Sequence, residues 1–182
     1  FKKIIKKKGV DATILLHPDI NITYFTQISP SYAIFIVSQR STELYMTSLD
    51  EKPNLKDVSV RSLKKGWENK LKNKRYQKIG LNYSSLTMVA FNKLKKIFPK
   101  AKFVDISKDL TELRSIKTEK EIGLIKKACN ITDKAFESVL EKLEKGKLKT
   151  EGDVSRFIER KFKESGAELA FPSIVAMGKN AA

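Results

Sequence analysis

The stretch Phe171-Pro-Ser-Ile-Val-Ala-Met-Gly-Lys-Asn-Ala-Ala182 decides how the rest of the chain is organised. Its short apolar, β-branched run is broken at Gly178 and Asn180, a pattern that predicts a buried strand leading into a turn. A strand needs partners, and a stable sheet needs several of them. Because no residue follows Ala182 to supply them, we expect this chain to be the front part of a larger protein.

Two amphipathic helices are predicted before this strand. Thr118 with Glu121 three residues later forms a capping-box pattern, and Gly146 predicts the end of this first helix. A second helix is predicted from an N-cap at Thr150 to Gly166. Apolar and small residues recur at steps of three and four along the first helix and give it one face: Ile122, Ile125, Cys129, Thr132, Phe136, Val139 and Leu143.

The first part of the chain mixes strand and helix patterns. A helix with one apolar face is predicted from Leu86 to Ile97, ended by Pro99. The fold class is therefore α/β: a domain over residues 1–108 with a mixed sheet and packed helices, then a second unit over residues 109–182. We expect the join within residues 107–117. The predicted strands are Ala12–His17, Tyr32–Ser38, Thr42–Ser48, Lys78–Leu81 and Lys102–Ile106, with a hairpin between the second and third.

Positive charge is concentrated in the first unit. Residues 1–108 carry 22 Lys and Arg against 8 Asp and Glu, while the rest carry 15 against 13, out of totals of 37 and 21. The basic residues from Arg61 to Lys78 surround Trp67 and Tyr76, an arrangement that could follow a phosphate backbone and stack on bases. Lysine outnumbers arginine there, which favours a solvated surface over a nucleic-acid site.

The residues needed for catalysis are scarce. His17 is the one histidine, and no metal-ligand spacing, glycine-rich phosphate loop or hydrolase nucleophile motif occurs. Cys129 alone permits no internal disulfide, and its place on the apolar stripe predicts core packing rather than nucleophilic chemistry. No apolar run approaches the roughly 20 residues of a membrane span. We expect a cytoplasmic protein, no membrane contact, and no catalytic metal pair in this chain.

Several stretches, in the right order, resemble one family. Leu110-Thr-Glu-Leu-Arg-Ser-Ile-Lys-Thr-Glu-Lys-Glu-Ile122, the helix from Ala128 to Phe136 and the stretch from Phe171 are similar to the pita-bread metallopeptidases. These are the Xaa-Pro dipeptidases (prolidases), aminopeptidases P and creatinases. Asp11–Leu16, Asn21–Thr26 and Ile79–Thr87 resemble the non-catalytic N-terminal domain of the same group.

The resemblance implies a pita-bread (α+β) catalytic domain of which residues 109–182 are the beginning. It implies hydrolysis of the bond before proline in a peptide substrate, with two divalent ions (Mn, Co or Zn). Their ligands, two Asp, one His and two Glu, would all follow Ala182, so the chain as given would be inactive. Phe171 and Ile174 match positions that line the pocket for the proline side of the substrate, although both could instead be sheet core.

The resemblance also implies a homodimer, in which the segment from Asn21 to Gln27 partly covers the partner's active site. Two alternatives stay open. A creatinase-like enzyme would use the same scaffold without metals, and a non-catalytic binding module of the same descent would use the basic front as its contact surface. Metal ligands after Ala182 would identify a peptidase.

Overall fold

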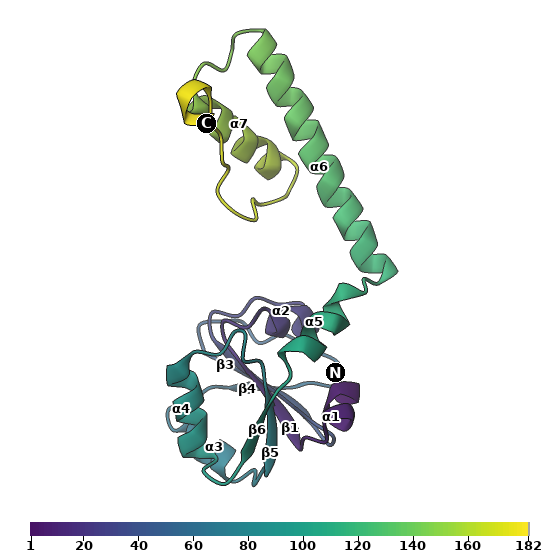
Figure 1. Cartoon of the computed structure of the whole chain (residues 1–182), viewed down its shortest axis with the longest axis vertical. Coiled ribbons are helices and arrows are strands. Elements are labelled where there is room, and N and C mark those ends of the chain that lie inside the picture. Colours follow the sequence, from purple (N-terminus) through teal and green to yellow (C-terminus); the bar gives the residue numbers. More distant parts are fainter. Residues whose placement is uncertain (182) are drawn as a thin grey trace. The chain divides into compact units, whose positions relative to one another are not determined.

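The structure, a computed structural model, describes residues 1–181 and divides into two compact units, Phe1–Ile116 and Lys117–Ala182 (Figure 1). The first unit contains α1 (Lys2–Lys8), β1 (Ala12–Leu16), α2 (Ile20–Thr26), β2 (Ala33–Ser38), β3 (Thr42–Met46), β4 (Ser59–Ser62), α3 (Trp67–Lys72), β5 (Lys78–Leu81), α4 (Met88–Ile97), β6 (Lys102–Asp105) and α5 (Ser107–Ser115). The second contains α6 (Glu119–Glu144), α7 (Glu151–Glu164) and a short 3₁₀ helix, η1 (Gly178–Ala181).

The first unit is built on one mixed sheet of six strands in the order β4-β3-β2-β1-β5-β6. β1 pairs antiparallel with β2 and β2 with β3, whereas β5 joins β1, β6 joins β5 and β4 joins β3 in parallel. The five predicted strands and the hairpin are therefore confirmed, and so is the α/β class. The edge strand β4 was not predicted.

Helices cover both faces of this sheet because its central strands are apolar on both sides. Alternate residues of β1 and β2 enter two separate cores. Leu15 and Phe35 lie in the core shared with α1, α2 and α5, while Ile14 and Ile36 lie in the core shared with α3 and α4. Figure 1 shows α3 and α4 on one side of the sheet and α1 and α5 on the other. The result is a three-layer sandwich.

One glycine is required by close packing within this unit. A Cβ at Gly80 in β5 would lie 3.0 Å from Thr13 Cγ2 and 3.1 Å from Ile106 Cγ2. Both neighbours are themselves buried side chains, so they have little room to move. Gly80 thus allows the central strands and the start of α5 to approach closely.

The observed division between the units falls after Ile116. The predicted boundary between residues 108 and 109 lies inside α5, and α5 belongs to the first unit because Leu110 is buried in its core. Lys7 and Lys8 of α1 also bind Asp109 of α5 at 3.0 and 2.9 Å. Packing and ion pairing therefore extend the first unit through this helix.

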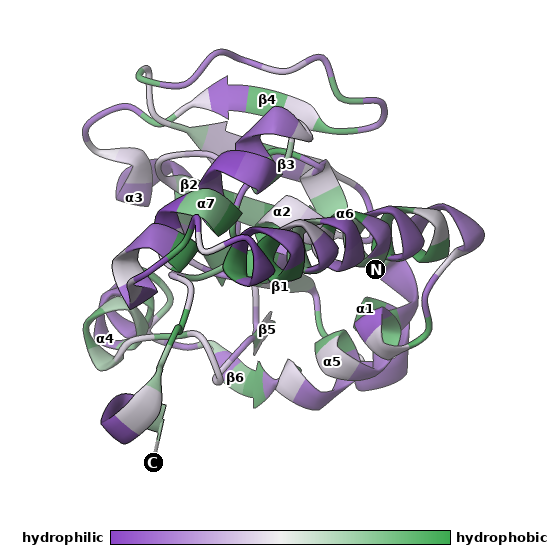
Figure 2. Ribbon diagram, turned by 90° about the horizontal axis from the view of Figure 1, so that it is seen from above, coloured by the Kyte–Doolittle hydropathy of each residue, from purple (hydrophilic) through white to green (hydrophobic). Residues whose placement is uncertain are grey.

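The second unit is a helical hairpin followed by a non-regular segment. The predicted capping box at Thr118 and the predicted N-cap at Thr150 are both formed, and Asp153 completes a capping box at Thr150 as well. α6 and α7 pack through Ala135, Val139 and Phe157, the buried residues of this pair. In Figure 2 hydrophobic and hydrophilic residues alternate along α6, as in an amphipathic helix. Large apolar side chains nevertheless remain exposed on α6: Leu124, Ile125, Phe136, Leu140 and Leu143.

Within residues 1–181, no helix combines the length and the apolar character that crossing a bilayer demands.

Candidate functional site

The predicted strand at Phe171 is not formed. Residues 172–177 have no regular secondary structure, and Phe171 and Ile174 are 69% and 90% exposed. A strand must satisfy its backbone groups with a neighbour, and no described residue pairs with this segment as a strand. The prediction of a buried strand is therefore wrong for this structure. The role of both side chains in a substrate pocket stays a prediction.

The end of this segment is nevertheless ordered. Residues 178–181 form η1, and Gly178 has the positive φ of 56° that favours glycine. Glu151, the first residue of α7, accepts hydrogen bonds from the Met177 amide and the Asn180 side chain. The exposed stretch that contains Phe171 and Ile174 is thus bounded by α7 at one end and by this contact at the other.

The residues present do not fit the metal pair that the family resemblance implies. Among residues 1–181, no three His, Cys, Asp or Glu side chains come together as a metal site would require. The Glu151 carboxylate is bound by an amide and a side-chain NH₂, both hydrogen-bond donors rather than companion ligands. No step of catalysis can be built on a metal held here.

Neither His17 nor Cys129 belongs to a group of three or more His, Cys, Asp or Glu side chains within residues 1–181. His17 follows β1, with its ring 5.8 Å from the ring of Tyr32. Cys129 is exposed on α6, so its predicted burial in a core is wrong. Of the predicted apolar face, Val139 is buried, whereas Ile125, Cys129, Phe136 and Leu143 are exposed.

A buried hydrogen-bond network lies at the carboxyl edge of β1 and β5. Asp19 caps α2 and accepts from the Asn21 backbone and side chain at 2.8 and 2.7 Å. Its other oxygen accepts from Asn82 Nδ2 at 2.8 Å and Ser85 Oγ at 2.9 Å. Arg114 of α5 donates to Asn21 Oδ1 at 3.4 Å. Each carboxylate oxygen of Asp19 accepts two hydrogen bonds from within the chain. The network therefore stabilises the fold and leaves this carboxylate unavailable to a ligand.

Apolar side chains remain exposed along the same edge. A pocket of ≈ 280 Å³ is lined by Tyr83, Leu86, Met88 and Phe91. Its neighbour of ≈ 290 Å³ includes His17, Tyr32 and Val89. We call Tyr32, Val89, Met88 and Tyr83, all of them exposed, the carboxyl-edge strip. Exposed apolar side chains at one edge of a domain are typical of a surface that contacts another protein.

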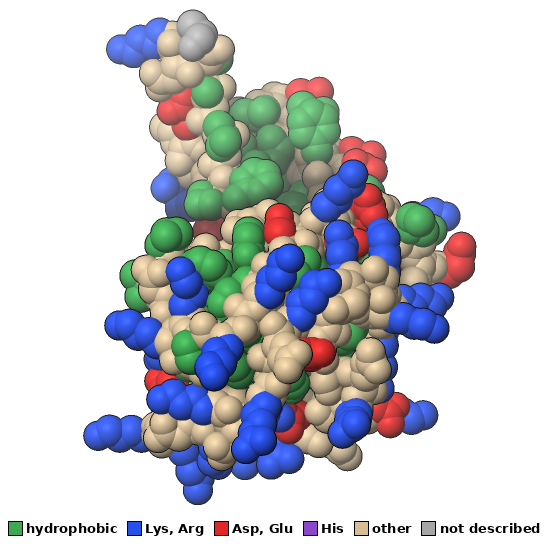
Figure 3. Space-filling model, turned by 60° about the horizontal axis from the view of Figure 1, so that its bottom comes forward, with side chains coloured by type: hydrophobic (Ala, Val, Ile, Leu, Met, Phe, Trp, Pro, Cys, Tyr) green, Lys and Arg blue, Asp and Glu red, His purple; other side chains and the backbone are tan. Residues whose placement is uncertain are grey.

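The opposite edge of the sheet is basic, for a reason of topology. α1, α3 and α4 each lead through a short loop into the start of a strand, so their carboxyl ends gather at the amino edge of β1, β5 and β6. Lysines complement the negative end of a helix dipole. Figure 3 shows basic side chains spread over this region. We call the basic residues there the basic face: Lys6, Lys7, Lys8, Lys70, Lys72, Arg75, Lys78, Lys95, Lys96 and Lys102.

The aromatic residues beside the basic face are not free to stack on bases. Trp67 and Tyr76 are half-buried and pack against the core below α3 and α4. Lys93 Nζ lies 4.6 Å from the centroid of the Trp67 ring, and the Tyr76 and Phe98 rings are 6.0 Å apart. Burial, with a smaller effect of Glu43, raises the pKa of the Tyr76 hydroxyl to about 12. These contacts hold both rings against the core, which supports the prediction that the basic face is a solvated surface and not a nucleic-acid site.

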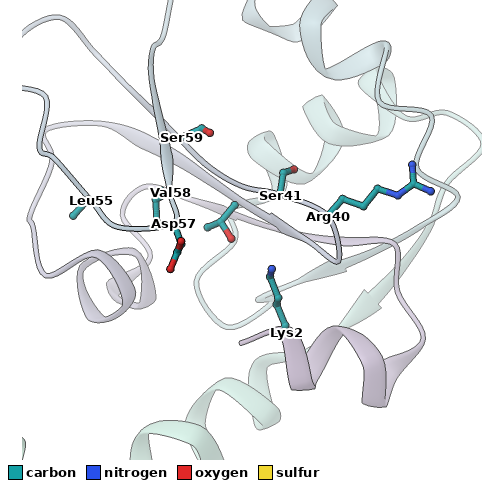
Figure 4. Close-up of a pocket in the computed structure, with 8 residues that line it drawn as sticks. Lys2, Arg40, Ser41, Leu55, Asp57, Val58 and Ser59 are labelled. Atoms are coloured by element: carbon teal, nitrogen blue, oxygen red, sulfur yellow. The ribbon is translucent and has the colours of Figure 1, made fainter.

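A large open pocket lies between the start of α1, the β2–β3 hairpin and the loop before β4 (Figure 4). Its volume is ≈ 700 Å³, and Lys2, Arg40 and Asp57 bring charges of both signs to its wall. All three side chains are exposed. The mixed charge and exposure give this pocket no feature that selects one ligand.

Comparison with protein families places two matches one after the other along this chain. Residues 1–116 match the creatinase/prolidase N-terminal domain, and residues 123–182 match metallopeptidase family M24. The Xaa-Pro dipeptidase of Pyrococcus horikoshii is 32% identical over 188 residues, which cover 100% of this chain and 52% of that protein. The Xaa-Pro dipeptidase of Pyrococcus furiosus is 31% identical over 187 residues, with 99% and 52% covered.

Solved structures show the same likeness. The crystal structure of the prolidase from Pyrococcus horikoshii superposes with a TM-score of 0.82 at 28% identity, covering 100% of this chain and 53% of that one. Both units thus have counterparts in one prolidase chain. This chain spans about half the length of the curated relatives it matches.

Proposed function

Since this chain belongs to the creatinase/prolidase N-terminal domain family and continues into a match to metallopeptidase family M24, we propose that the protein is a metal-dependent peptidase that cleaves the bond before proline in Xaa-Pro dipeptides. Residues 1–181 contribute scaffold and substrate recognition. The two divalent ions would be bound by residues outside this range, because those within it offer no ligand set. We also propose a cytoplasmic location, which suits a chain with one free cysteine.

The proposed substrate contacts come from the exposed segment of the second unit. Phe171 and Ile174 would form an apolar wall against the proline ring, and their high exposure leaves both side chains available for it. The Phe171–Pro172 step supports this role, because a residue before proline is restricted to extended conformations. A wall of this kind provides binding and orientation while the chemistry takes place elsewhere.

The observation that carries the proposal is the consecutive match of both families in one chain. The direct test is hydrolysis of Leu-Pro by the full-length gene product, with Leu-Gly as the control dipeptide. We expect cleavage of Leu-Pro that is lost on chelation and restored by Mn²⁺ or Co²⁺. Equal cleavage of both dipeptides, or none of either with metal present, would contradict the proposal.

The same assay separates the two alternatives. A creatinase-like enzyme would hydrolyse creatine and keep that activity after chelation. A binding module would show no hydrolysis of any of these substrates. The relatives at 31% and 32% identity are both Xaa-Pro dipeptidases, which favours the peptidase.

We further propose that the protein forms a homodimer through the first unit. The carboxyl-edge strip supports this, because Val89, Met88 and Tyr83 are exposed there and Met88 and Tyr83 line one pocket. Val89→Lys should shift a concentration-dependent dimer to monomer in sedimentation velocity. Leu49→Lys, at a comparably exposed apolar residue that lines neither pocket of the strip, is the matched control. A monomeric wild-type protein at micromolar concentration, or a dimer unaffected by Val89→Lys, would contradict this interface.

A further inference from the structure

Glu151 makes three hydrogen bonds to a part of the chain far from it in sequence. Its Oε1 accepts from the Met177 amide at 2.8 Å and from Asn180 Nδ2 at 3.0 Å. Its Oε2 lies 3.2 Å from the same Asn180 nitrogen. The partners follow Glu151 by 26 and 29 residues. Among the described residues, no lysine or arginine forms an ion pair with this carboxylate.

Glu151 is not needed to begin its own helix. Thr150 accepts from the Asp153 amide at 3.1 Å, and Asp153 accepts from the Thr150 amide at 3.1 Å, which completes a capping box. The Glu151 carboxylate also lies in the first turn, where the helix dipole favours a negative charge. An ionised acceptor at this place makes stronger hydrogen bonds than a neutral one. Its contacts with the later segment are thus additional to capping.

The contact between Glu151 and Met177 constrains the segment that joins the end of α7 to Met177. α7 has 14 residues and is therefore about 21 Å long. The chain leaves its carboxyl end at Ser165 and returns to its amino end at Met177. Phe171 and Ile174 lie on this returning stretch, which has no regular secondary structure before η1. Glu151 fixes where the stretch ends and so limits where both side chains can lie.

We propose that Glu151 is a positioning residue for substrate recognition: it holds the Met177–Asn180 turn against α7 and thereby fixes the apolar wall formed by Phe171 and Ile174. This inference rests on the proposed function, because the wall matters only in a peptidase that binds proline. Glu151 contacts no reacting group in this account. It acts through the backbone of the segment that it holds.

The tether is tested first in this chain by amide hydrogen exchange. Glu151→Ala and Asn180→Ala should each speed exchange of the Met177 amide by about tenfold, since each removes hydrogen bonds that order the turn. Glu151→Asp should do the same, because its shorter side chain keeps the first-turn charge but does not reach Met177. Unchanged exchange of Met177 in these variants would overturn the tether.

Asp153→Asn is the matched control, since it removes a first-turn charge of the same helix and weakens the capping box without touching Met177. Met177 exchange should stay within about twofold of wild type in this variant. If Asp153→Asn speeds it as much as Glu151→Ala does, then the turn depends on the helix start and the inference is wrong.

The positioning role is tested by kinetics of the full-length gene product with Leu-Pro. Glu151→Ala should raise KM by about tenfold with kcat within about threefold of wild type. Glu151→Gln, which keeps one acceptor for the Met177 amide, should recover part of the loss. An active wild type whose KM is unchanged by Glu151→Ala would overturn the positioning role. A wild type that cleaves no Xaa-Pro dipeptide would contradict the proposed function, and the exchange data alone would then decide the tether.

Discussion

Asp19 joins three parts of the first unit through one buried carboxylate. It caps α2 and holds Asn82 and Ser85, which follow β5. Asp19→Ala would leave several buried donors without an acceptor, so it should lower the free energy of unfolding by about 2–4 kcal/mol. Urea denaturation measures this loss.

Asp50→Ala is the control for Asp19→Ala. Asp50 also accepts several hydrogen bonds, from Ser31 and Thr47, but those from Ser31 are exposed. Water can replace its carboxylate there, so the loss should stay below about 1 kcal/mol. Equal losses of unfolding free energy for the two variants would show that burial of the Asp19 network adds nothing to stability.

Asp109 makes the stability of the first unit dependent on pH. Burial alone would raise the pKa of this carboxyl, but hydrogen bonds from Lys8 and Lys7 outweigh it and lower the pKa below its ordinary value of 3.8. The folded state thus binds this proton less tightly than the unfolded state. The stabilisation is complete above about pH 4 and is lost as the pH falls through the folded pKa.

Asp109→Asn should therefore flatten the fall in unfolding free energy between about pH 4 and pH 2, while lowering stability at pH 7. Thermal denaturation across this range compares the two proteins. Parallel pH profiles for wild type and variant would contradict the predicted linkage.

Sequence spacing could not reveal the residue contacts of the candidate site. Glu151 reads as an ordinary first-turn acid, because its partners lie 26 and 29 residues away. Periodicity predicted the face on which Cys129 lies but not whether another element covers it. Phe171 and Ile174 were identified by resemblance, and their role remains a prediction.

Among the helices and strands, those with a strong sequence pattern within a few residues were predicted. The apolar runs of β1, β2 and β3 and the capping boxes of α6 and α7 are strong patterns within a few residues, and all are formed. The short helices α1, α2, α3 and α5 and the strand β4 were missed. α1 buries only Ile4 and Ile5 among five lysines, so its stability comes from tertiary packing rather than from its own sequence.

The basic face should bind nucleic acid only through charge. Most of its basic residues lie at the carboxyl ends of α1, α3 and α4 or at the starts of β5 and β6, while Trp67 and Tyr76 pack on the core. We expect weak binding of single strands and duplexes without sequence preference, lost between about 50 and 200 mM salt as counterion release requires. Fluorescence anisotropy with labelled oligonucleotides measures this.

The aromatic residues provide the discriminating variant for that experiment. Trp67→Ala and Tyr76→Ala each remove the ring that a stacking platform would need, so each should change binding little if charge alone acts. A loss of about 1–3 kcal/mol at physiological salt, as a stacking platform would show, would instead support the binding-module alternative.

At the scale of the whole molecule, the two units differ in how much apolar surface they bury. The first has a core on each face of its sheet, whereas the second buries mainly Ala135, Val139 and Phe157. Limited proteolysis with subtilisin should therefore cut first at or after Ile116, which is 82% exposed. A resistant fragment ending near this residue should remain. Equal resistance of both units would contradict the division.

In the proposed peptidase, residues 1–181 provide scaffold and recognition, while the metal chemistry depends on residues outside them. Calorimetric titration of this chain with Mn²⁺ and with Co²⁺ tests this most directly, since a metal pair needs several converging ligands to bind tightly. We predict no stoichiometric binding at micromolar concentration, in keeping with the absence of any ligand cluster among these residues. Tight binding of two ions per chain would contradict the account.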